Sequence, residues 1–336
     1  MHYRQRLEEL EVKNLAAQAA LSINSKGREH SEEQCELRTV FQRDRDRIIH
    51  SKAFRRLKHK TQVFIAPEGD HYRTRLTHTL EVAQVARGIA KALALNEDLT
   101  EAIALAHDLG HTPFGHAGEE ALDEVYTPGF EHNQHSLRVV KLLEFKKAAY
   151  LGLNLTYEVR DGILNHTGKQ KPITLEGEIV KIADRIAYIN HDIDDALRGG
   201  IISKSDLPQS ALEVLGQSHS LRINRMVRDI VENSYQAKQI QMSPTVKKAT
   251  NNLRDFLYAE VYIGSQAKEE EDKVKNLLKK FFNYYNQNPQ RLPTEFRNKL
   301  GDFELDRIVI DYIAGMTDRY ALNKAQELFL PQAWPS

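Results

Sequence analysis

The sequence has a single cysteine, Cys35, in 336 residues. One cysteine cannot form a disulfide within the chain, so a disulfide framework is excluded and we expect a reducing, cytoplasmic setting. An excess of one charge is also lacking, because 47 Lys and Arg residues balance 47 Asp and Glu residues. The chain therefore has no overall field that would draw it to nucleic acid or to an anionic membrane, and any site for a polyanion must be local.

Long apolar runs are absent as well. No segment approaches the length of a membrane span, and the charged N-terminus, residues 1–8, lacks the apolar core of a signal peptide. We therefore expect no membrane association. Repeats, low-complexity tracts and Gly/Ser linkers are also missing, so a division into independent domains is not required.

Apolar residues recur with helical spacing, and no segment alternates convincingly with the period of a strand. We predict an all-α protein with an N-terminal helical segment (1–40), a helical core (41–200) and a C-terminal helical extension packed on the core (201–336). The charged run 268–273 is interpreted as a solvated helix face. Within the core, helices are predicted at residues 75–93, 98–110, 136–149, 156–166 and 176–197, with another that begins near His116.

The predicted helix 98–110 ends in an unusual pair. Glu101 completes a capping box with Asp98 at its start, and Gly110 suits a left-handed position at its end. The last turn then presents His107 and Asp108. Residues 112–115, Thr-Pro-Phe-Gly, cannot continue a helix, so a tight connection should follow.

Four residues form a mixed nitrogen and oxygen ligand set. His107 and Asp108 follow the apolar segment 102–106, where an unpaired carboxylate would cost several kcal/mol to bury. Asp184 lies in an equally apolar helical run, and His78 is in the first turn of its helix. A lone histidine is more often a hydrogen-bonded core residue than a ligand, but one divalent ion shared by all four residues resolves these burial conflicts together.

The identity of the ion is less determined. Two imidazoles and two carboxylates suit manganese, iron, nickel, cobalt or zinc, whereas magnesium normally prefers oxygen alone. A five- or six-coordinate ion would leave room for water and substrate. A second ion held by His111, His132 or His166 is the weaker alternative.

Other polar residues gather near this set. His116 and Glu119 are one helical turn apart, so the carboxylate can orient the ring. An ordinary surface pair would look the same, but its place eight residues after Asp108 favours a catalytic role. The helix that carries Asp184 has a polar arc of Asp184, Arg185, Tyr188, His191, Asp192 and Asp195.

Four segments of the chain resemble the dGTPase-like deoxynucleoside triphosphate triphosphohydrolases of the HD phosphohydrolase superfamily. They are residues 47–64, 72–78, 107–116 and 317–321. The resemblance extends from about the fortieth residue to near the C-terminus. It implies that residues 41–200 are an HD phosphohydrolase core and that the protein hydrolyses a deoxynucleoside triphosphate to a deoxynucleoside and inorganic triphosphate.

The resemblance also implies roles for residues and partners. It predicts magnesium- or manganese-supported activity, a homo-oligomer, and water at the metal as the nucleophile on the α-phosphorus. His116 would protonate the leaving 5′-oxygen, and activation of the water is the alternative. The expected catalytic residues are His116, Glu119, His132 and His111, with His135 as an alternative to His132. The expected substrate contacts are Arg75, Arg185 and Tyr188 to phosphate, Asp192 to sugar or phosphate, and Lys58, His59, Lys60 and Gln62 to the nucleoside or phosphates.

Two rival functions stay open at the level of sequence. One is another HD-type nucleotidase or phosphodiesterase, which would keep the metal without the triphosphate contacts. The other is a nucleotide-sensing or single-strand nucleic-acid-binding oligomer, for which residues 55–60 and 273–280 would supply local basic patches. The sequence leaves the base preference, any activating nucleotide and the oligomer order undecided.

Overall fold

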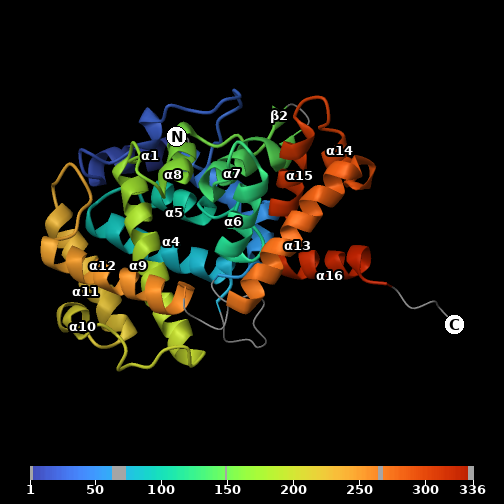
Figure 1. The fold of residues 1–336 in the computed structure, drawn as a ribbon. Coiled ribbons are helices and arrows are strands. Elements are labelled where there is room, and N and C mark those ends of the chain that lie inside the picture. The colour runs from blue at the N-terminus through green and yellow to red at the C-terminus, as the bar shows by residue number, and fades with distance from the viewer. Residues whose placement is uncertain (1–2, 63–72, 148–149, 264–267, 332–336) are drawn as a thin grey trace.

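The computed structural model describes residues 3–62, 73–147, 150–263 and 268–331, which fold around a buried helix, α5 (Glu97–Ala106). Helices α2 (Val40–Ile49), α4 (Arg75–Ala92), α8 (Tyr157–Asn165) and α9 (Leu175–Arg198) all pack against it (Figure 1). Residues 102–106 of α5 are buried without exception, as expected for a helix that is apolar on all sides. The C-terminal end of α5 therefore lies in the interior of the molecule.

The remaining elements before α9 are short. They are α1 (Tyr3–Asn14), the 3₁₀ turns η1 (Ser22–Asn24) and η2 (Leu57–His59), α3 (Lys52–Arg56), α6 (Gly115–Val125), α7 (His132–Arg138), the π-helical turn η3 (Val139–Leu143), and the strands β1 (Phe145–Lys147) and β2 (Tyr150–Leu151). We refer to residues 107–114, which join α5 to α6, as the α5–α6 loop.

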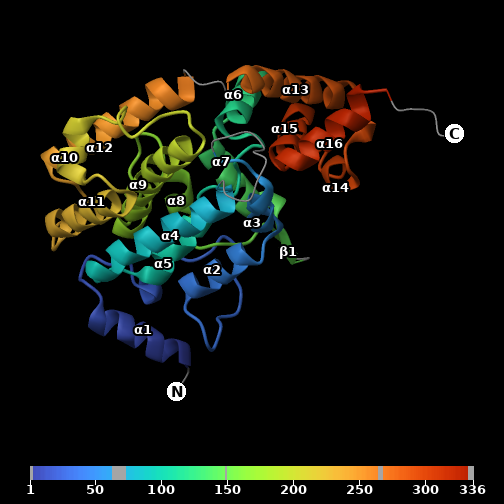
Figure 2. The ribbon, with the colours of Figure 1, turned by 90° about the horizontal axis from the view of Figure 1, so that it is seen from below.

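The C-terminal third of the chain lies at two opposite ends of this core (Figures 1 and 2). The first group shares the main apolar core with α4 and α9. The second group forms a separate apolar cluster with α6, which includes Leu122, Phe281 and Ile310. The first group consists of α10 (Gln209–Leu215), α11 (His219–Ser234), α12 (Pro244–Leu257) and the π-helical turn η4 (Tyr258–Ile263). The second consists of α13 (Lys268–Gln287), η5 (Pro289–Arg291), α14 (Thr294–Arg297), α15 (Leu305–Ala314) and α16 (Asp318–Phe329).

The all-α fold class is confirmed. The predicted helices at 75–93, 156–166 and 176–197 correspond to α4, α8 and α9, and the helix with Glu119 corresponds to α6. Leu80 departs from the predicted apolar face, because it is 50% exposed. The run 268–273 begins α13, where Glu270, Asp272 and Lys273 are exposed as expected. Among the described residues, none of the helices combines the length and apolar character needed to cross a membrane.

The helix predicted at 98–110 begins close to the predicted residue, at Glu97, but its predicted cap and its predicted C-terminal end are wrong. Asn96 caps the helix by accepting from Leu99 N at 3.1 Å, which takes the place of the predicted capping box, and the helix stops at Ala106. Gly110 does not adopt a left-handed conformation. A Cβ at Gly110 would instead lie 2.2 Å from Ser136 N, so glycine is needed there because the α5–α6 loop presses against α7.

The helix predicted at 136–149 is also wrong in its second half. The helical turns end at Leu143, and β1 and β2 form a short antiparallel pair that no alternating apolar pattern had indicated. Val63, Phe64 and Tyr72, which belong to the segments that carry the family resemblance, lie outside the described residues.

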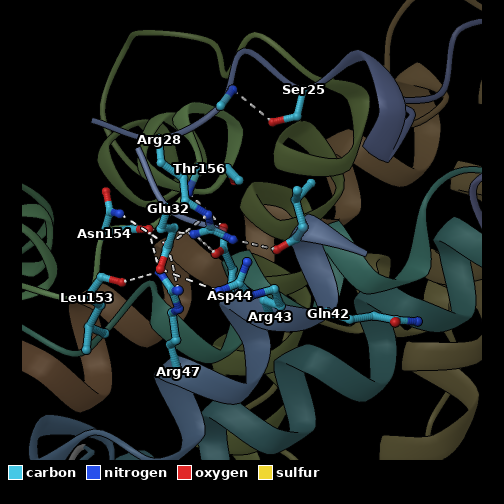
Figure 3. A network of polar contacts seen from close by, with 12 residues as sticks. Ser25, Arg28, Glu32, Gln42, Arg43, Asp44, Arg47, Leu153, Asn154 and Thr156 are labelled. Atoms are coloured by element: carbon cyan, nitrogen blue, oxygen red, sulfur yellow. Dashed lines mark hydrogen bonds and ion pairs between the residues drawn. The ribbon is translucent and has the colours of Figure 1, made fainter. Parts of the chain in front are cut away.

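A buried network of ionic groups attaches the N-terminal segment to the core (Figure 3). Glu32 Oε1 accepts from Arg47 Nη2 at 2.6 Å and lies 3.3 Å from Arg28 Nε. Asp44, fully buried, accepts from Arg28 Nη1 and from the backbone of Thr156. Because charges removed from water must be compensated by partners in the protein, this network fixes residues 28–32 against α2 and the start of α8.

The network should contribute strongly to stability. Asp44→Ala removes one of the two carboxylates that compensate the buried guanidinium of Arg28 and leaves the N–H of Thr156 without its acceptor, so we expect the free energy of unfolding to fall by roughly 3–5 kcal/mol. Asp46→Ala on the same helix is the control, because Asp46 pairs with Arg38 at the surface and should cost about 1 kcal/mol or less. Urea denaturation followed by circular dichroism measures both values. Equal losses of unfolding free energy in the two variants would show that the buried network contributes no more to stability than a surface ion pair.

Candidate active site

The four predicted metal ligands converge at the end of α5. His78 comes from the first turn of α4, His107 and Asp108 begin the α5–α6 loop, and Asp184 lies on α9. His78 Nε2 is 3.0 Å from Asp184 Oδ1, and His107 Nε2 is 3.6 Å from Asp108 Oδ1 and 3.7 Å from Asp184 Oδ1. One ligand atom each from His78, His107 and Asp108 lie within 4.8 Å of one another. The packing of α4, α5 and α9 thus assembles a set that the sequence spreads over about a hundred residues.

The chemistry of this set fits a divalent ion. His107 Nδ1 is 2.7 Å from the carbonyl of Ala104, so the neutral ring carries its proton there and turns the lone pair of Nε2 towards the carboxylates. That buried Nε2 has no hydrogen-bond partner among the described residues. An unpartnered imidazole nitrogen beside two carboxylates is the arrangement that a bound cation would satisfy.

Arg75 contributes to the same charge balance. Its Nη1 donates to Asp108 Oδ2 at 2.6 Å, and both side chains are buried. Burial alone would raise the pKa of Asp108, but the imidazole of His107, when it is protonated, and the guanidinium of Arg75 outweigh burial and hold the pKa well below its ordinary value. Asp108 is therefore a carboxylate with one oxygen on Arg75 and the other near His107. Sequence reasoning assigned Arg75 to phosphate alone and missed this contact.

A row of imidazoles leads from the predicted metal ligands to the surface. Neighbouring ring centroids lie between 4.7 and 5.7 Å apart. The members, in order, are His78, His107, His166, His132, His111 and His116. His166, which the sequence suggested only as a ligand of a second ion, is the link between His107 and His132.

Glu119 holds the outer part of this row. It accepts from His132 N and lies 2.8 Å from His132 Nδ1, whereas its distances to His111 Nε2 and His116 Nδ1 are 3.8 and 3.7 Å. Burial would raise the pKa of Glu119, but the interactions with nearby His116 and with hydrogen-bonded His132 lower it far below its usual value. The predicted pairing of Glu119 with His116 is therefore present but loose, and the tighter partner is His132.

The hydrogen bonds of His132 require two ring protons. Its Nδ1 faces the Glu119 carboxylate, and its Nε2 is 3.2 Å from His166 Nε2. His166 Nδ1 lies 2.7 Å from the carbonyl of Ile163, so a neutral His166 carries its proton on Nδ1 and offers Nε2 as an acceptor. Burial lowers the pKa of His166 to about 3, with the charges of His107 and His132 acting in the same direction. His132 is the protonated member of the pair.

The polar arc of α9 meets the C-terminal part of the chain. Arg185 Nη2 donates to Asn251 Oδ1 on α12, and Tyr262 of η4 donates its hydroxyl to Asp192 Oδ2. Burial raises the pKa of Asp192 to about 7, against the lowering effect of the Tyr262 hydrogen bond. Tyr188 is partly buried on the same arc. Sequence reasoning missed Tyr262, because no local pattern connects residues that are 70 positions apart.

The other predicted substrate residues divide into two groups. Lys58 and His59 are exposed on η2, and neither has a hydrogen bond or ion pair with the site within the described residues. The carbonyl of Gln62 lies close to the start of α6, where a Cβ on Gly115 would be 3.5 Å from it. Gln62 Oε1 is buried and has no partner among the described residues. Of these three, only Gln62 is next to the site.

Residues far apart in the chain hold the α5–α6 loop. Asp318, at the start of α16, accepts from Phe114 N and Thr61 N, each at 2.9 Å. Lys60 Nζ donates to the carbonyl of His111 and, at 2.8 Å, to that of Ala314. Phe114 has φ 63°, a left-handed conformation that costs energy for a side chain of this size, and the bond to Asp318 stabilises it. The loop that carries His111 and leads to His116 is thus fixed by both ends of the protein.

Comparison with known proteins agrees with this architecture. The model of the HD domain matches residues 75–189, which contain all four predicted ligands, and the model of the phosphohydrolase-associated domain matches residues 240–327. A "deoxyguanosinetriphosphate triphosphohydrolase-like protein" of Caldanaerobacter subterraneus subsp. tengcongensis is 58% identical over 99% of this chain and 98% of its own. Proteins with the same name from Clostridium tetani and Clostridium perfringens are 47% and 48% identical, and each alignment covers 99% of this chain and at least 97% of the relative.

These identities extend over nearly the whole length of both partners in each comparison. The two domain matches place an HD domain and a C-terminal phosphohydrolase-associated domain in the same chain. The chain belongs to the deoxyguanosinetriphosphate triphosphohydrolase-like family of HD-domain enzymes.

Proposed function

We propose that the protein hydrolyses deoxynucleoside triphosphates to a deoxynucleoside and inorganic triphosphate, with a divalent ion at His78, His107, Asp108 and Asp184. The observation that carries the proposal is the contact between two clusters. Asp108 belongs both to the group with His78 and His107 and to a second group with His111 and His132. A phosphate at the first cluster would have acid/base groups beside it. The names of the relatives support the triphosphate substrate.

The expected reaction breaks one bond at the α-phosphorus. The oxygen of a water molecule forms a bond to phosphorus, the bond from phosphorus to the 5′-oxygen breaks, and a proton on that oxygen completes the deoxynucleoside. A bound divalent ion, with magnesium or manganese as the activating ions, would lower the pKa of water and offset charge on the phosphate oxygens. His107 is already in the tautomer that such an ion requires.

The proton for the leaving oxygen would come from the row of imidazoles. His116 is the proposed donor, because it stands at the exposed end of the row with 80% of its side chain open to solvent, where a substrate can reach it. Glu119 connects His116 to His132, and the second proton on His132 can replace the one that is transferred. In this scheme Glu119 orients His116, and His132 supplies the proton that restores His116 to its acid form. His111 stacks on His132 and lies 3.8 Å from Glu119.

Arg75, Arg185 and Tyr188 are the proposed triphosphate contacts, and Asp192 the proposed sugar contact. Arg75 would have a double role, since the same guanidinium compensates Asp108 and can offer further N–H groups to a phosphate oxygen. Tyr262 would form part of the sugar pocket, because its hydroxyl donates a hydrogen bond to Asp192. Tight packing there is expected to disfavour a 2′-hydroxyl. We also propose a homo-oligomer, as the family resemblance implies.

Product analysis tests the function directly. The purified protein is incubated with each dNTP, singly and in mixtures, and with NTPs and dNMPs, and the products are separated by chromatography. We expect deoxynucleoside and intact inorganic triphosphate from dNTPs, with poor turnover of the other two classes. Release of orthophosphate from a dNMP, without triphosphate from any dNTP, would instead identify an HD-type nucleotidase.

Removal of one proposed ligand should remove the metal. His107→Ala deletes an imidazole nitrogen of the set, so we expect loss of bound metal and of activity together, with helical content retained. Metal is measured by inductively coupled plasma mass spectrometry and helicity by circular dichroism. His50→Ala is the control, because His50 is exposed and lies outside the site. A His107→Ala protein with full metal occupancy would remove His107 from the set.

Loss of the proposed acid should affect chemistry rather than binding. We expect His116→Ala to lower kcat by roughly 100-fold or more while metal content and KM change little. Glu119→Gln should act in the same direction, because it removes the charge on which the second proton of His132 depends. Steady-state kinetics separates the two parameters. A higher KM with an unchanged kcat in His116→Ala would show that His116 binds substrate and does not transfer the proton.

A further inference from the structure

A cavity lies beside the α5–α6 loop, because Leu109 of that loop lines it. Its volume is about 330 Å³, and α3, η3, β2, α14 and α15 surround it. Pockets for small molecules range from roughly 300 to 1,000 Å³, so this cavity is of a size to hold one. None of the proposed metal ligands or catalytic histidines lines it.

The basic groups of the cavity lack acidic partners. Lys52, Arg56 and Lys299 line it, and their side chains form no hydrogen bond or ion pair with any residue that the structure describes. Asp311 and exposed Glu295 both offset part of the charge of Lys299 through space, and Asp311 does so more strongly. The two buried acids of the lining, however, have closer partners.

Those two acids are Glu144 and Asp311. Glu144 accepts from the backbone N–H groups of Lys52 and Ala53, at 3.0 and 2.6 Å, and so caps α3. Asp311 accepts two hydrogen bonds from Arg138 Nε and Nη2, at 2.8 and 2.7 Å, and a further arginine, Arg307, lies 2.9 Å away. Both carboxylates therefore have closer partners than the cavity cations, which leaves the charges of Lys52, Arg56 and Lys299 without an ion pair among the described residues.

His135 adds a further donor. Its Nδ1 lies 2.7 Å from Arg307 Nη2, which can only donate, so the neutral ring carries its proton on Nε2. That buried Nε2 has no hydrogen-bond partner among the described residues. Burial, together with the charge of Arg307, lowers the pKa of His135 well below its usual value and keeps the ring neutral. The polar groups of the lining that lack partners are thus mostly donors.

The rest of the lining is apolar. The apolar side chains are Leu109, Val139, Leu142, Leu143, Leu151 and Phe296. Lys299 Nζ lies 5.5 Å from the centroid of the Phe296 ring, so the charged and apolar parts adjoin. A ligand that suits both must carry negative oxygens on one part and an apolar group on another.

We propose that this cavity binds an organic phosphate, with the phosphate at Arg56, Lys52 and Lys299 and its apolar group against Phe296 and the leucines. Inorganic polyphosphate shares the anionic half of this chemistry and is the other source of such a ligand. The site is separate from the proposed substrate site, and the proposal does not depend on which reaction occurs there.

Occupation of the cavity should reach the α5–α6 loop. Leu109 lines the cavity directly, and Lys60, also in the lining, donates to the carbonyl of His111. Between them, Gly110 lies against the backbone of His135 so closely that a Cβ there would be 2.4 Å from His135 C. Three successive residues of the loop therefore touch the cavity wall. A ligand that fixes this wall would restrict the loop that leads to His116.

The first test counts bound ligands by isothermal titration calorimetry. Inorganic triphosphate is titrated into the full-length wild type and into Arg56→Gln, Lys299→Gln and Arg225→Gln, and phenyl phosphate and inorganic phosphate are titrated as a matched pair. Arg225 is exposed on α11 and gives the same change of charge away from the cavity. We expect Arg56→Gln and Lys299→Gln each to lose one bound triphosphate per chain relative to the wild type, whether or not the substrate site also binds it. Arg225→Gln should match the wild type.

The two probes distinguish the sources of the ligand. If the apolar wall contributes, phenyl phosphate should bind roughly tenfold more tightly than inorganic phosphate, as burial of a ring predicts. Equal affinities would limit the site to inorganic anions and overturn its assignment to organic phosphates. An unchanged number of bound triphosphates in both Arg56→Gln and Lys299→Gln, with normal circular dichroism, would overturn the site itself.

Two measurements on the same proteins complete the test. In the wild type, triphosphate should protect Lys52 and Lys299 from reductive methylation, as read by mass spectrometry, so the result does not rely on a variant that could misfold. Hydrogen exchange at residues 109–111 should be slower in the triphosphate-bound wild type than in Arg56→Gln at the same concentration. No protection of either lysine would contradict the site, and equal exchange would contradict its connection to the loop.

Discussion

The structure depends on the compensation of one buried carboxylate. Asp108 lies at the end of α5, a helix enclosed by apolar neighbours, and is only 4% exposed. Its charge cannot be solvated there, so the guanidinium of Arg75 must supply the balance to Asp108. These two groups fix the start of α4 against the end of α5, and Asp184 on α9 joins them through His78. The same need for positive charge makes this point of the fold suitable for a divalent ion.

The α5–α6 loop shows how distant segments maintain that arrangement. Lys60 and Asp318 hold it from the N-terminal and C-terminal parts of the chain, and Ser136 Oγ of α7 accepts from Gly110 N at 2.9 Å in its middle. A loop held at three points loses little conformational entropy when a substrate binds. The role of the C-terminal helices is therefore partly to keep residues of the central site in place.

The row of imidazoles gives the proposed chemistry a physical path. Charge at the inner end is set by Asp108 and Asp184, and charge at the outer end by Glu119. His166 lies between the two ends with a pKa near 3, so it stays neutral while His132 keeps its second proton. Carboxylates placed at both ends thus decide which rings are protonated. Glu119, assigned from sequence as the partner of His116, serves His132 more closely.

Sequence by itself determined the helices with a strong apolar period and the four residues of the proposed metal set, because an isolated charge in an apolar helix is a local signal. It also carried the segments that indicated the family. Only the tertiary structure decided that Asn96 caps α5, that Tyr262 meets Asp192 and that Asp318 holds Phe114. Gly110 shows the reason: glycine there suggested a helix end, yet it is required by the backbone of α7, 26 residues away. Contacts of that kind depend on how helices pack against one another, which no local pattern records.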